Sequence, residues 1–190
     1  MNHVRGVSIL GLCGLTLTLA SGCYAQEPTT RGPKGLAAPE AHPVTAKLIA
    51  EHSSIQAGLQ TRVGILFDIE RGWHIYAQDP GDAGLPTKIV WEIPPVVSLG
   101  PLHWPKPQEF VDPGEIRTFG YTGTVVIYRT ALLRLGLLLD RSYADGLPFR
   151  ATVKWLACKN ICIPGSANLE LMIPFSPQPP TLSPDAKWFR

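Results

Sequence analysis

Residues 59–69 read LQTRVGILFDI, and this stretch decides the fold class. Its bulky apolar residues stand at every second position: Val63, Ile65, Phe67 and Ile69. Because alternate side chains of a β-strand point to the same face, this period predicts a strand with one buried side. Residues 124–131 are rich in β-branched and aromatic residues, and residues 169–173 alternate in the same way. Strands therefore dominate the chain.

Turn-forming sequences separate these runs at short intervals, for example at residues 70–72, 112–114 and 164–165. No stretch shows a sustained 3.6-residue period, although residues 132–139 fit either a helix or a strand. Many short strands with frequent turns predict an all-β domain, an immunoglobulin-like β-sandwich. A closed barrel is the alternative architecture.

The N-terminus has the three parts of an export signal: a basic start, an apolar run and small residues at a cleavage zone. We expect a signal peptide over residues 1–25 and a periplasmic location. The alternative is a lipoprotein signal that ends at Cys23, which would then carry a lipid anchor. Either outcome leaves two unmodified cysteines in the mature chain, Cys158 and Cys162.

Proline-rich stretches at both ends of the remaining chain mark the limits of a single domain. Residues 26–43 are expected to form a flexible leader, residues 44–175 one β-sandwich domain, and residues 176–190 a proline-rich tail. The formal net charge is only +2, which gives no strong field for nucleic acid or anionic membranes. Hydrolase motifs and phosphate-binding glycine loops are missing, and no cofactor is expected.

Cys158 and Cys162 form a C-x-x-x-C motif near the end of the predicted domain. Trp155 and Cys158 fall on opposite faces of the strand that enters the motif, so a core-facing Trp155 leaves Cys158 facing outward. A disulfide needs Cα atoms about 4.4 to 6.8 Å apart, whereas four residues of extended strand span about 13 Å. The chain must turn between the cysteines, which predicts a β-hairpin with both at its neck.

Three uses of this pair are open. A stabilising disulfide in a non-catalytic interaction module is the commoner use in exported domains, but closing so short a loop restricts the unfolded chain by only about 2 kcal/mol. A tight, outward-facing disulfide is readily attacked by another thiolate, which favours thiol–disulfide exchange. Two thiolates also suffice for Cu(I), but the histidines are scattered singly, and no metal site is expected.

Five ordered landmarks give the sequence a resemblance to a known family. They read GWHIY at 72–76, DPGDAGLPT at 79–87, WPKP at 104–107, FGYTG at 119–123 and WLACKNICIP at 155–164. Together they resemble the N-terminal periplasmic domain of the DsbD family of thiol:disulfide interchange proteins, which includes the ScsB-like reductases. The resemblance covers about residues 44–175, and its specificity rests on the order of all five landmarks.

The resemblance implies an immunoglobulin-like sandwich in which Cys158 and Cys162 are the catalytic pair of a protein-disulfide reductase component. In this family a membrane-embedded conduit donates electrons, and periplasmic thioredoxin-like proteins and disulfide isomerases accept them. Some acceptors serve cytochrome c biogenesis. An aromatic cap loop shields the cysteines, and Phe119 and Tyr121 fall where that loop is expected.

Two departures from the family pattern narrow these expectations. Well-known DsbD proteins have a longer C-x5-C loop, so the C-x-x-x-C spacing is closer to the ScsB-like branch. The sequence has neither the transmembrane conduit nor a C-terminal thioredoxin-like domain, so the donor is expected to be a separate protein. Cys162 is the first choice as the attacking thiolate, and the reverse order with Cys158 stays open.

Overall fold

The computed structural model describes residues 42–134, 143 and 145–190. The predicted signal peptide, the alternative lipid site at Cys23 and the leader up to residue 41 lie outside the described residues. The same holds for residues 135–139 of the stretch that fits either a helix or a strand. In the part of the chain that is described, no helix has the length and apolar character needed to span a membrane.

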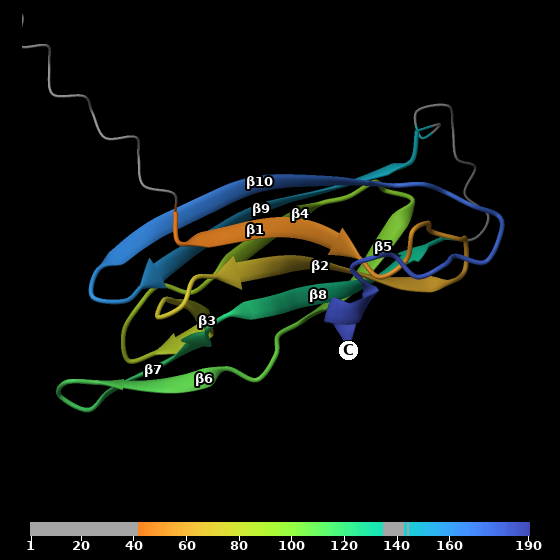
Figure 1. Cartoon of the computed structure of the whole chain (residues 1–190). Helices are drawn as coiled ribbons and strands as arrows, with labels where there is room; N and C mark the ends of the chain where they lie inside the picture. Colours follow the sequence, from red (N-terminus) through yellow and green to blue (C-terminus); the bar gives the residue numbers. More distant parts are fainter. Residues whose placement is uncertain (1–41, 135–142, 144) are drawn as a thin grey trace, which may run out of the picture. The chain divides into compact units, whose positions relative to one another are not determined.

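The described strands form two antiparallel sheets that pack face to face (Figure 1). The first sheet has four strands, in the order β1 (Val44–Ala50), β2 (Gln60–Ile69), β8 (Thr124–Leu133) and β5 (Val97–His103). The second has the order β10 (Cys162–Ile173), β9 (Leu147–Cys158), β3 (His74–Gly81), β7 (Ile116–Tyr121) and β6 (Gln108–Asp112), and β4 (Lys88–Glu92) also pairs with β9. The predicted all-β, immunoglobulin-like sandwich is confirmed.

The core lies between the two sheets. It contains the side chains that the alternation of apolar residues predicted to be buried. The four apolar residues of β2 named above are each at most 4% exposed. In β9 the odd-numbered residues from Leu147 to Ala157 are buried, while Arg150, Thr152 and Lys154 are exposed. The rings of Phe67 and Trp155 meet edge to face across the two sheets, with centroids 5.7 Å apart.

The turn expected at Pro164 and Gly165 is wrong, because β10 runs without interruption from Cys162 to Ile173. Gly165 lies opposite Trp155 in the β9–β10 register. A Cβ atom on Gly165 would lie 2.3 Å from the indole ring. The glycine therefore gives the Trp155 ring room to lie across the strand, and it does not mark a turn.

Strands β3 and β4 both pair with the same edge of β9. Between these pairings the chain leaves the edge in an excursion, residues 78–87, which includes the end of β3. His74 and Ile75 pair with Cys158 and Ala157, and β4 resumes the pairing at Lys154 with Lys88. The hydroxyl of Thr87 donates to the carbonyl of Tyr76 at 2.6 Å, and both residues are buried. This hydrogen bond closes the base of the excursion.

The segment predicted as a proline-rich tail, residues 176–190, packs against the outer face of the first sheet. Its backbone pairs with the chain after β1, where Ser53 donates to the carbonyl of Thr181 at 2.9 Å. It ends in a 3-10 helix, η2 (Ala186–Phe189), whose Phe189 is 3% exposed and packs with Ile49 and Leu66. The segment thus shields a second apolar cluster from water.

Glu51 and Arg62 form an ion pair beneath this segment, and it predicts a pH dependence of stability. The Arg62 guanidinium donates to the Glu51 carboxylate and to the Phe189 carbonyl. Hydrogen bonding to Arg62 lowers the pKa of Glu51 below its ordinary value of 4.5, although burial opposes this. A lowered folded pKa stabilises the fold above the unfolded pKa, and the contribution is lost as pH falls through the folded pKa.

We therefore expect the difference in unfolding free energy between wild type and Glu51→Gln to be constant between about pH 7 and pH 5 and to shrink below about pH 4.5. Urea unfolding at several pH values measures it. Glu109→Gln, which breaks an exposed ion pair with Arg117, is the matched control and is expected to cost less than about 1 kcal/mol. A Glu51→Gln difference that stays constant into acid would contradict the assignment.

Candidate functional site

The predicted hairpin is present, and its neck is the disulfide between Cys158 and Cys162. Cys158 ends β9, Cys162 begins β10, and the two are directly opposite in the register, with Cα atoms 4.2 Å apart. The three connecting residues are closed by the Lys159 amide, which donates to the carbonyl of Ile161 at 3.0 Å. Cys158 and Cys162 are the only two cysteines in the part of the chain that the structure describes.

The two cysteines differ in exposure. Cys162 is exposed, whereas Cys158 is 3% exposed. Cys158 lies on the face opposite to Trp155, as the alternation predicts, but the expectation that the whole disulfide faces solvent is wrong. An incoming thiolate therefore has access to the sulfur of Cys162 before that of Cys158.

On the side away from Cys162, Cys158 is next to a residue of β3 that in turn stacks on a residue of β6. His74 is directly opposite Cys158 across the β3–β9 pair, on the side away from Cys162. The Phe110 ring stacks on the His74 ring, with centroids 4.6 Å apart and planes inclined by 22°. The rings of Tyr76 and His74 meet edge to face, with centroids 5.2 Å apart. Cys158 thus borders an aromatic cluster that we call the His74 cluster: His74, Tyr76 and Phe110.

Gly120 makes room for this cluster. It lies opposite Tyr76 on β7, and an added Cβ atom would sit 2.2 Å from the carbonyl oxygen of Ile75 and 3.4 Å from the Phe110 ring. The excursion covers the cluster from the other side, since a Cβ atom on Gly84 would lie 2.4 Å from the Tyr76 ring. The φ of Gly84 is 96°, a value that favours glycine.

The two residues predicted to form a cap, Phe119 and Tyr121, both lie in strand β7 and not in a loop. Tyr121 is opposite Ile75, is 4% exposed, and donates its hydroxyl to the carbonyl of Pro105 at 2.9 Å. Burial raises its pKa. Phe119 packs against the main core. The structure does not bring this pair to the face that carries Cys158, and their cap role stays a prediction.

The sequence pattern contained a signal for the aromatic neighbour that was missed. His74 and Tyr76 alternate with Ile75 and Ala77, so a period of two places them together on the face away from the core. The link from His74 to Cys158 depends on strand register, which alternation alone does not supply. Within the described residues, no group of three or more His, Cys, Asp or Glu side chains is positioned to hold a metal ion.

The family model described as "Thiol:disulfide interchange protein DsbD, N-terminal" matches residues 41–174. The chain belongs to this family. It is a DsbD N-terminal domain, a thiol:disulfide interchange domain with a cysteine pair placed to form a disulfide. Domains of this family interact with other thiol–disulfide proteins.

Two solved structures are similar to this DsbD N-terminal domain. The N-terminal periplasmic domain of ScsB from Proteus mirabilis has 21% sequence identity and a TM-score of 0.52, over 81% of this chain and 54% of that one. The reduced N-terminal domain of DsbD from Neisseria meningitidis has 15% identity and a TM-score of 0.39, over 66% of this chain and 83% of that one. This chain thus spans about half the length of the ScsB chain, and comparison with curated proteins gives no match.

The ScsB-like branch that the short cysteine spacing indicates stays an expectation from the sequence. At these identities the likeness supports the fold. The chemistry of the domain rests on the family assignment and on the geometry of Cys158 and Cys162.

Proposed function

We propose that this protein is a periplasmic relay that passes reducing equivalents to disulfide-containing partners through Cys158 and Cys162. The observation that carries the proposal is the asymmetry of the pair, with Cys162 exposed and Cys158 buried. An attacking and a resolving thiol need this difference, because the partner must reach one sulfur and the second must stay in reserve.

The proposed exchange has two steps. The Cys162 thiolate attacks one sulfur of the partner disulfide, and the partner's other sulfur leaves as a thiolate. Cys158 then attacks the sulfur of Cys162, the second partner thiol leaves, and the Cys158–Cys162 disulfide forms. Two electrons and two protons pass to the partner in total. In the oxidised chain, the donor's thiolate attacks Cys162 and the steps run in reverse.

The proposed partners follow from the family. A membrane-embedded DsbD-like conduit donates electrons, and periplasmic thioredoxin-like proteins or disulfide isomerases accept them. The activity is that of a protein-disulfide reductase component. This assignment is supported by the match to the DsbD N-terminal family over residues 41–174.

The reduction potential of the pair tests the proposal against an inert, structural bridge. We expect equilibration with thiol buffers to give a potential above about −300 mV, in the range of exchanging disulfides. The reduced chain is also expected to pass electrons to an oxidised thioredoxin-like protein. A potential well below that value, together with no transfer, would mean that the disulfide only stabilises the fold.

A further inference from the structure

The outward face of β4, β9 and β10 is a ladder of cross-strand rows that ends at the disulfide. From the far end, the rows are Glu92–Arg150–Glu170, Val90–Thr152–Asn168, Lys88–Lys154–Ser166, Leu156–Pro164 and Cys158–Cys162. The members of each row are neighbours on one face, since residues opposite each other in an antiparallel pair share a side. Charge and apolar character therefore change in steps along the path to the cysteines.

The two charged rows differ in how their charges are matched. Arg150 lies between two carboxylates, 3.1 Å from Glu170 and 3.7 Å from Glu92. Lys88 and Lys154 are directly opposite each other and both exposed, and neither forms an ion pair with any described residue. Like charges at opposite positions destabilise a strand pair. The fold thus places an unmatched double positive charge two rows from the disulfide.

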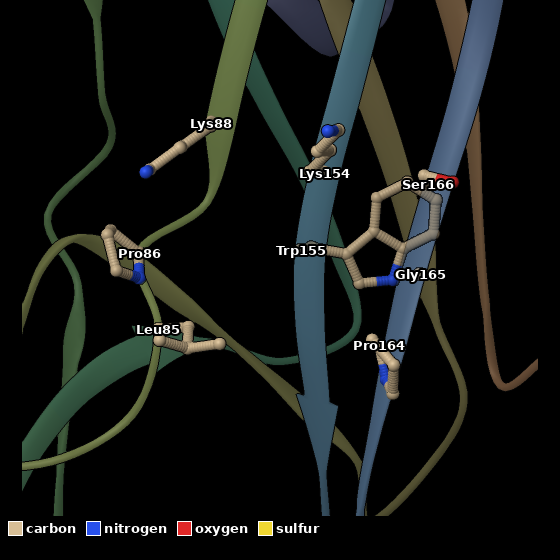
Figure 2. A pocket seen from close by; sticks show the side chains of 8 residues that line it. All are labelled: Leu85, Pro86, Lys88, Lys154, Trp155, Pro164, Gly165 and Ser166. Atoms are coloured by element: carbon tan, nitrogen blue, oxygen red, sulfur yellow. The ribbon is translucent and has the colours of Figure 1, made fainter.

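An apolar groove of about 510 Å³ surrounds the lysine row. Leu85 and Pro86 of the excursion form one wall, Pro164 lies on the β10 side, and Trp155 with Gly165 completes the lining (Figure 2). Leu85 is 61% exposed. Pro164 and Leu156 continue the apolar surface as far as the cysteine row. We call this surface the lysine groove: Leu85, Pro86, Lys88, Lys154, Trp155, Pro164, Gly165 and Ser166.

We propose that the lysine groove binds an extended segment of the partner thiol–disulfide protein that carries both apolar side chains and carboxylates. The inference rests on the proposed function, because the segment leads to the partner's reacting cysteine. The carboxylates of the segment form the ion pairs that Lys88 and Lys154 lack within the described chain, and its apolar side chains cover Leu85 and Pro164. A basic segment is repelled by the same pair.

The distance between the lysine row and the cysteine row predicts where the carboxylates lie in the partner's segment. The lysine row is four residues from the cysteine row along β9, which is about 13 Å in a strand. Four residues of extended peptide span about the same distance. The partner's carboxylates are therefore expected about four residues from its reacting cysteine.

Short peptide disulfides test this proposal. The acidic probe is acetyl-Cys-Gly-Leu-Glu-Glu-amide with its thiol joined to 2-thiopyridyl, and matched probes carry Lys-Lys or Gln-Gln in place of Glu-Glu. A second set has the cysteine at the other end. The reduced chain attacks the peptide sulfur and displaces pyridine-2-thione. The second cysteine then releases the peptide thiol as the protein disulfide forms, so that one probe disulfide is reduced for each protein dithiol oxidised.

For the wild type we expect at least one acidic probe to react about fivefold to tenfold faster than its basic counterpart, as two exposed ion pairs allow. Salt is expected to reduce this ratio. K88E/K154E should reverse the preference and K88Q/K154Q should abolish it, when each rate is expressed relative to that of the Gln probe on the same variant. K106E/K187E reverses two exposed lysines outside the groove, so it matches the change in net charge and should keep the wild-type preference.

Equal rates for acidic and basic probes in both peptide sets would overturn the lysine groove as a binding site. The same conclusion follows if K106E/K187E removes the preference as fully as K88E/K154E, because the effect would then be one of net charge. The Gln probe separates the two proposals. If it fails to oxidise the reduced wild type, the cysteine pair does not exchange and the proposed function itself is wrong.

Discussion

Replacing Cys158 by serine is expected to trap a mixed disulfide on Cys162 that the wild-type chain resolves and releases. Cys162 is exposed and stays reactive, but the thiol that displaces the partner is gone. Cys162→Ser leaves only the buried Cys158, whose reaction needs a local opening of the structure near the His74 cluster. Both variants are expected to lose multiple turnover entirely, because each lacks one half of the dithiol.

The rate of the single remaining thiol distinguishes the two roles. We expect Cys158→Ser to react with a neutral aromatic disulfide about tenfold to hundredfold faster than Cys162→Ser, the range that a local opening of a few kcal/mol gives. Mass spectrometry of the trapped adduct identifies the linked cysteine. Unfolding in urea would restore equal reactivity if burial is the cause. Faster reaction of Cys162→Ser in the folded state would reverse the assignment.

Phe67→Ala is expected to lower the free energy of unfolding by about 3 to 5 kcal/mol. Phe67 is 0% exposed, and its ring contacts Trp155 on the opposite sheet, so the substitution leaves a cavity and removes an aromatic pair. A domain of this size has a total stability of about 5 to 15 kcal/mol, and the variant is expected to be close to unfolding. Urea unfolding followed by circular dichroism gives the value.

Phe175→Ala is the matched control, since it makes the same chemical change at a residue that is 41% exposed. Its cost is expected at about 1 kcal/mol, as only part of the ring leaves an apolar environment. Equal costs at Phe67 and Phe175 would show that the contact between the sheets contributes little.

Alternation along the sequence predicted the core, because the side of a strand that meets the opposite sheet depends only on the period of two. Val63, Ile65 and Phe67 are each 0% exposed, as that period requires. The same period assigns Leu66 to solvent, yet Leu66 is 7% exposed. Its cover is Phe189, which is distant in the sequence, and no local pattern predicts that contact.

For the redox pair, too, local sequence predicted one part of the structure and not the other. The distance that a disulfide permits was enough to predict the hairpin and its neck. The neighbour of Cys158 on β3, His74, is fixed by the register between β3 and β9, and His74 in turn stacks on Phe110 of a further strand. Strand order and register are set by the packing of the whole domain, so the difference between the two cysteines was not available from their spacing.

The excursion between β3 and β4 has a consequence for the choice of partner. Residues 78–87 leave and rejoin one edge of β9, and the hydrogen bond from Thr87 to Tyr76 closes their base. Leu85 and Pro86 therefore belong to one short segment that lines the lysine groove and, through Gly84, also packs against the Tyr76 ring near the redox pair. A change in this segment is therefore expected to alter the choice of partner and the surroundings of Cys158 together.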